Sequence, residues 1–171
     1  YNITKDGLQG QYNSMIASVL KYKGFYVARY EAGLDNTTKK VVFKNAKTTS
    51  GVTTLSADSS NSNMWYGLYK KIKTFTTSSD KVVSSMIWGS QYDAMMNWMA
   101  KTGNTVEAAD DTKRNTTTIT GKTEEGKKPD IINNIYDLYG CHFEWTLEAI
   151  SSKYRANRGG FSDGNLSPAR R

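Results

Sequence analysis

Cysteine and histidine are almost absent from this chain. Its 171 residues include one cysteine, Cys141, and one histidine, His142. A single cysteine excludes an internal disulfide and a cysteine-cluster metal site. The two residues are neighbours, and neighbours on a strand point to opposite faces, so we do not expect them to act as a nucleophile and its base.

Long apolar runs are missing as well. No stretch approaches the roughly 18 residues needed to cross a bilayer, so no membrane insertion is predicted. The start of the chain, Y-N-I-T-K, lacks the apolar stretch of a secretory signal. This leaves the compartment open, because a processed piece or a virion component would look the same. The sequence also lacks the glycine spacing of a phosphate-binding loop.

The composition that remains predicts one domain over residues 1–171, with a modest core and much loop. The hydrophobic fraction is 37% and the mean hydropathy is -0.63. The formal net charge is +7, and it comes mainly from seventeen lysines that are scattered among acidic residues. Dispersed lysines are typical of solvated surfaces, so nucleic acid is not an expected partner.

Apolar spacing predicts three helices. One covers 11–22 with a buried stripe, and one covers 64–73 with its lysines on the outer side. The third follows Gly89, with Ser90 as its cap. Four of its side chains are expected to fill the core: Tyr92, Met95, Met96 and Met99.

Strands and loops occupy the rest of the chain. Aromatic and β-branched residues predict a mostly buried strand over 24–33 and a short strand over 41–43, with a turn between them. Alternation predicts a half-buried strand through 143–147, with Trp145 in the core. The polar segment 101–129 is expected to be a long surface loop, and 154–171 to be loop and short strand.

Three segments together carry a resemblance to one family. Residues 24–31 read G-F-Y-V-A-R-Y-E, residues 134–146 read N-I-Y-D-L-Y-G-C-H-F-E-W-T, and residues 158–161 read R-G-G-F. With W-G-S-Q-Y-D at 88–93, they resemble the formylglycine-generating-enzyme-like (sulfatase-modifying factor) domains of the C-type-lectin-like superfamily. The resemblance spans residues 11–171. It implies an α+β, C-type-lectin-like fold of short helices around small twisted antiparallel sheets, with much irregular loop.

Two features depart from the family's pattern. Cys141 and His142 follow the glycine where the family has an asparagine. Relatives also run on to a closing strand that has no counterpart after Pro168, which predicts a fold incompletely represented at its C-terminus.

The resemblance implies a member that is not an enzyme. The family's enzymes bind copper through two cysteines shortly after the R-G-G segment, and related iron enzymes use a histidine cluster. Residues 161–168 hold no cysteine, and the chain has one histidine, so neither chemistry is expected. No cofactor is predicted. Calcium stays open, because oxygen ligands such as Asp137 or Asp163 could hold it.

Non-catalytic members of the superfamily bind ligands. They include the variable proteins of diversity-generating retroelements and phage receptor-binding proteins, which display a hypervariable C-terminal surface. Residues 154–171 lack Lys, Glu, Gln, Met and Trp, as expected of codons diversified from asparagine. The resemblance therefore implies a virion-associated or extracellular adhesion protein that contacts a protein or cell-surface ligand. The alternative is a degenerate sulfatase-maturation-like domain with a structural or carbohydrate-binding role.

The predicted ligand-binding surface lies mainly on the C-terminal segment. Its Tyr, Ser, Asn and Gly residues are the types that binding loops favour, although an inert loop is the alternative interpretation. The predicted contact residues are Tyr139, His142, Tyr154, Asn157, Phe161, Ser162, Asp163, Asn165, Leu166, Ser167 and Arg170.

Three charged residues are instead interpreted as structural. Arg29, Glu31 and Arg158 stand among apolar neighbours, and a buried charge has to be paired. We therefore predict an ion-pair network there.

Overall fold

The computed structural model describes residues 3–44, 49–55, 64–77, 81–102, 131–136, 144–151 and 154–159. Within these ranges the chain is α+β, with three helices and small antiparallel sheets. The helices are α1 (Lys5–Tyr22), α2 (Met64–Ile72) and α3 (Gly89–Lys101). The strands are β1 (Gly33–Asp35), β2 (Val41–Val42), β3 (Val52–Thr54), β4 (Ile131–Ile132), β5 (Ile135–Tyr136), β6 (Glu144–Ala149) and β7 (Arg155–Arg158).

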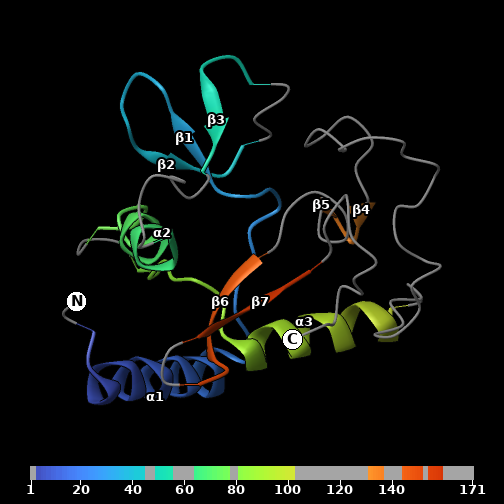
Figure 1. The fold of residues 1–171 in the computed structure, drawn as a ribbon. Coiled ribbons are helices and arrows are strands. Elements are labelled where there is room, and N and C mark those ends of the chain that lie inside the picture. The colour runs from blue at the N-terminus through green and yellow to red at the C-terminus, as the bar shows by residue number, and fades with distance from the viewer. Residues whose placement is uncertain are drawn as a thin grey trace.

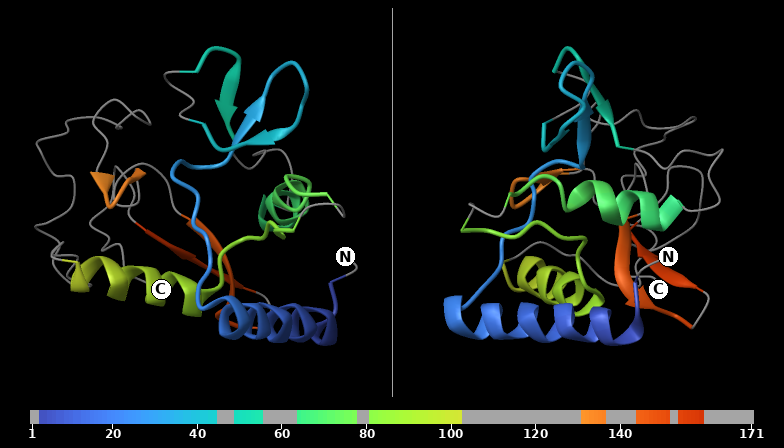
Figure 2. Two further views of the ribbon diagram at one scale, coloured as in Figure 1. Left: turned by 180° about the vertical axis from the view of Figure 1, so that it is seen from behind. Right: turned by 90° about the vertical axis from the view of Figure 1, so that its left-hand side faces the viewer.

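The β6–β7 hairpin lies at the centre of the described fold. Helices α1 and α3 lie below it in Figure 1, and α2 and the sheet of β1, β2 and β3 lie above. Figure 2 shows the same order from behind and from the side. The strand orders are β2-β1-β3, β4-β5 and β6-β7, and every pairing is antiparallel.

Helix α1 is present as predicted but begins earlier and buries less. The Thr4 hydroxyl accepts a hydrogen bond from the backbone N–H of Gly7 at 3.0 Å, which caps the helix start. No residue of α1 is buried, and Leu20 and Tyr22 are 65% and 69% exposed. The predicted buried stripe is therefore wrong. The helix rests on the body through partial contacts, such as the edge-on Tyr12–Trp88 ring pair with centroids 5.0 Å apart.

The predicted strand over 24–33 is also wrong. Residues 24–32 form no strand, Tyr26 is 92% exposed, and the sheet begins only at Gly33. A Cβ at Gly33 would lie 2.8 Å from a methyl group of Val52, so glycine permits the close approach of β1 and β3. Aromatic and β-branched residues favour a strand only where a neighbouring strand is available to pair with them.

The predicted turn and second strand agree better with the structure. Strand β2 covers two of the three residues predicted at 41–43, and it pairs with β1. In the turn between them, the backbone N–H groups of Thr37 and Thr38 donate to Asp35 Oδ1 at 3.0 and 2.7 Å. Hydrogen bonds from Thr38 and Thr37 hold the pKa of Asp35 below its ordinary value.

Two buried clusters form the core. Helix α3 supplies the first, and its side chains are those predicted from the sequence: Tyr92, Met95, Met96 and Met99. The second joins α2, β2 and β6, and its buried members are Val41, Tyr69, Ile72, Met86 and Leu147. Ser90 is not the cap of α3, because the helix already includes Gly89. The Gln91 side chain instead accepts a hydrogen bond from the backbone N–H of Trp88 at 3.1 Å.

No helix in the described part of the chain is long and apolar enough to cross a membrane. Of the predicted surface loop over 101–129, only residues 101 and 102 are described, and Lys101 is the last residue of α3.

Candidate functional site: the β6–β7 hairpin

The β6–β7 hairpin carries the described part of the predicted binding surface. Trp145 pairs with Asn157 and Ala149 with Arg155, so β6 has three residues between the two pairs where β7 has one. This bulge explains why the predicted alternation fails: Leu147 is buried as expected, but so is its neighbour Thr146. The backbone N–H of Ile150 donates to the carbonyl of Tyr154 at 3.0 Å and closes the turn.

The inner face of the hairpin is fully buried. Thr146 and Ala156 are 0% exposed, and Arg158 is 2% exposed. The Thr146 hydroxyl donates to the Ala156 carbonyl at 2.9 Å and accepts from the Glu148 N–H at 3.1 Å. Both roles of the hydroxyl are thus satisfied, which makes its burial inexpensive and fixes β6 against β7.

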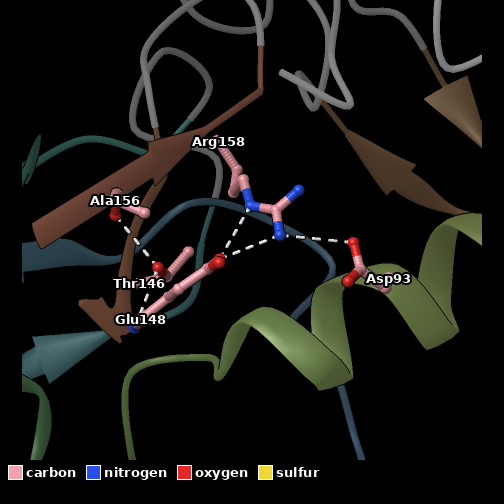
Figure 3. Close-up of polar contacts among 5 residues, drawn as sticks. All are labelled: Asp93, Thr146, Glu148, Ala156 and Arg158. Atoms are coloured by element: carbon pink, nitrogen blue, oxygen red, sulfur yellow. Dashed lines mark hydrogen bonds and ion pairs between the residues drawn. The ribbon is translucent and has the colours of Figure 1, made fainter. Parts of the chain in front are cut away.

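Arg158 is held by two carboxylates from different elements (Figure 3). Its Nη2 lies 2.8 Å from Glu148 Oε2 on β6 and 3.3 Å from Asp93 Oδ1 on α3, and its Nε donates to the same Glu148 oxygen at 3.2 Å. The guanidinium also lies over the Tyr92 ring, 5.5 Å from the centroid. The predicted pairing of Arg158 is confirmed. Arg29, by contrast, is exposed.

The absence of a side chain at Gly89 leaves room for the Glu148 carboxylate. A Cβ at Gly89 would lie 2.8 Å from Glu148 Cδ and 3.2 Å from Glu148 Cβ, and closer still to Oε2. Only a residue without a side chain leaves room for this carboxylate beside the start of α3. The sequence singles out Arg158 as a charge needing partners, but it does not reveal Glu148 and Asp93, because their proximity depends on how α3 packs against the hairpin.

Two predicted contact residues, one just before β7 and one on it, are accessible. Tyr154 is 67% exposed and Asn157 is half-buried, so both predicted contact residues present side-chain surface to solvent. Arg155 lies between them in the sequence, and its guanidinium covers the Trp65 ring of α2, 4.9 Å from the centroid. Trp65 in turn donates its ring N–H to the Thr146 carbonyl at 2.7 Å. Trp145, predicted as core, is half-buried and packs against the second cluster.

The other predicted contact residues lie outside the described residues. They are Tyr139, His142, Phe161, Ser162, Asp163, Asn165, Leu166, Ser167 and Arg170.

The segments that carry the family resemblance meet in space where the structure describes them. Arg158 contacts Tyr92 and Asp93 of the 88–93 segment. The backbone N–H of Tyr136 donates to the Arg29 carbonyl at 2.9 Å, and the rings of Tyr30 and Tyr136 lie 4.6 Å apart. These contacts join the segments in two pairs, 158–161 with 88–93 and 134–146 with 24–31.

Among the described residues, no three Asp, Glu, His or Cys side chains gather into a group that could hold a metal ion. The carboxylates of Glu148 and Asp93 instead face an arginine. Comparison with known proteins gives no match to a family model, to a curated protein or to a solved structure.

Proposed function

We propose that this chain is a non-enzymatic ligand-binding display domain that contacts a protein or cell-surface ligand through its C-terminal surface. We further propose that it is a variable protein of a diversity-generating retroelement or a phage receptor-binding protein. Its proposed location is on the virion or outside the cell. The observation that carries it is the contrast in burial within residues 154–158. Ala156 and Arg158 are buried, whereas Tyr154 is exposed and Asn157 half-buried.

This contrast suits display, because buried side chains fix the strand while Tyr154 and Asn157 present side-chain surface to a ligand. Changes at Tyr154 or Asn157 remove no buried contact of Thr146, Ala156 or Arg158. Tyrosine offers a large contact area at little cost in conformational entropy, and asparagine adapts its hydrogen bonds. The single cysteine and single histidine leave the family's copper and iron chemistries without enough ligands.

The laboratory test compares outward and inward substitutions by urea denaturation. We expect Tyr154→Ala combined with Asn157→Ala to cost less than about 1 kcal/mol of unfolding free energy, as surface changes do. Trp145→Ala should cost more, about 2 to 4 kcal/mol, because this aromatic packs against the core while remaining half-buried. Equal losses would mean that Tyr154 and Asn157 are structural, and the display proposal would fail.

A comparison of related gene sequences supplies the second test. Copies of this gene from related genomes should differ mainly within 154–170, with replacements drawn from the asparagine-codon set, and should lie near a reverse transcriptase gene. Differences spread evenly along the chain would favour the degenerate sulfatase-maturation-like alternative instead.

A further inference from the structure

Helix α2 presents a group of aromatic rings that stack on one another. The Trp65 and Tyr69 rings are stacked with centroids 5.3 Å apart and an interplanar angle of 11°. Tyr66 stacks on Tyr69 at 6.3 Å. Three rings from fewer than two turns of helix therefore form one stack, in which Tyr69 is buried and Trp65 and Tyr66 are half-buried.

Each of these rings has a cation over it. The Lys70 ammonium lies 5.6 Å from the Tyr66 centroid, and the Lys73 ammonium lies 5.0 Å from the Tyr69 centroid. Arg155 of β7 covers Trp65 in the same way. Lys73 also donates to the Tyr69 hydroxyl at 3.2 Å. The rings hold these cations in place, so an anion that binds them costs less side-chain entropy than it would at freely moving lysines.

The charged residues of α2 and of the turn after it have one sign. Residues 64–77 contain Lys70, Lys71 and Lys73 and no Asp or Glu, and all three lysines are exposed. Lys70 and Lys73 are three positions apart, which places them on one side of the helix. A polyanion meets a positive potential along this side.

The apolar side chains of α2 face the core. Tyr69 and Ile72 are buried in the second core cluster, and Trp65 and Tyr66 pack against it, so these side chains form no apolar centre among the exposed lysines. Protein interfaces have such a centre and are depleted in lysine. Single-stranded nucleic acid stacks its bases on aromatic side chains. Here each ring already has a neighbouring ring and a cation, so the site offers charge more than stacking.

We propose that Lys70, Lys73 and Arg155 form a docking surface for a sulfated polysaccharide. Such a chain carries repeated negative groups and needs neither an apolar centre nor bare ring faces. The surface adjoins Tyr154 and Asn157 through Arg155, but it depends on other side chains. The inference therefore stands or falls independently of the proposed display function.

The test measures the dissociation constant of a defined heparin oligosaccharide in low-salt buffer. We expect Lys70→Gln with Lys73→Gln to weaken binding about fivefold, as the loss of two surface ion pairs predicts. The matched control is Lys5→Gln with Lys40→Gln, which removes the same charge from exposed lysines elsewhere. The dissociation constant of this control should stay close to that of the wild type. Lys70→Arg with Lys73→Arg should retain binding, and far-ultraviolet circular dichroism checks the fold of each variant.

Three results would overturn the proposal. Equal weakening in both glutamine variants would mean that net charge alone attracts the polyanion. Tighter binding of a single-stranded oligonucleotide or of polyglutamate than of the heparin oligosaccharide would mean that the surface serves another class of partner. Loss of binding by Tyr154→Ala with Asn157→Ala, with the lysine variants unaffected, would place the contact on the hairpin instead.

Discussion

Arg158 is the only charged residue that is buried in the described part of the chain. A buried guanidinium is tolerated only with anionic partners, and here they come from β6 and α3. The two carboxylates differ in setting: the Glu148 side chain is 23% exposed, whereas that of Asp93 is 44% exposed. Glu148, closer and more buried, is the stronger partner, and Asp93 extends the link to the helix.

Arg158→Met tests this arrangement at the scale of one residue. Removing the cation leaves the partly buried Glu148 carboxylate without its main partner, so we expect a loss of about 3 kcal/mol of unfolding free energy in urea denaturation. Arg155→Met is the control, because its guanidinium covers a ring and is half-buried. It should lose less than about 1 kcal/mol. Arg158→Met matching the wild type would show that the ion pairs are dispensable.

At the scale of elements, two helical glycines have opposite surroundings. Gly89 opens α3 against the Glu148 carboxylate, whereas a Cβ at Gly67, inside α2, would meet nothing within 4 Å. Gly67→Ala should therefore stabilise the protein by about 0.5 to 1 kcal/mol through helix propensity alone.

Gly89→Ala should instead destabilise the protein. The added methyl group displaces Glu148 and with it the Arg158 pair, so we expect a loss of about 1 to 3 kcal/mol. Thermal melts of the two alanine variants beside the wild type measure both effects. If both alanine variants melt at a higher temperature than the wild type, the Glu148 side chain moves aside freely.

The elements that the sequence predicts best are those whose signal is local. Helix α3 follows from the spacing of Tyr92, Met95 and Met99, which repeats with the helical period. The 24–33 strand fails because its residue types describe a preference, while a strand also needs a partner that only the fold supplies. In the same way, the need to pair Arg158 is predictable, but the choice of Glu148 and Asp93 is not. Tyr154 and Asn157 were predicted as contacts from residue type, and the fold adds that Tyr154 is exposed just before β7 and that Asn157 is half-buried on it.

At the scale of the whole molecule, the helices differ in how firmly they are attached. Helix α3 buries Tyr92, Met95, Met96 and Met99, whereas α1 buries no residue and meets the body through contacts such as the hydrogen bond from the Tyr69 hydroxyl to Gln11 at 2.9 Å. Less burial means a smaller free energy of local opening.

Amide hydrogen exchange in native conditions should therefore separate the two helices. We expect α1 amides to exchange through local opening at least tenfold faster than those of the middle of α3, because opening α3 exposes a core cluster. Equal protection in both helices would show that α1 unfolds only together with the whole domain.

The Thr146 hydroxyl has a consequence for how the hairpin finds its pairing during folding. A slip of β7 by one residue would turn Arg158 to the opposite face, away from Glu148, and would take the Ala156 carbonyl from its hydroxyl donor. A misaligned hairpin would thus leave the buried Thr146 hydroxyl without its acceptor and the partly buried Glu148 carboxylate without its cation, which is a penalty on the wrong alignment. Because the penalty depends on inward groups alone, it acts as a check on strand alignment that is indifferent to which side chains stand at 154 and 157.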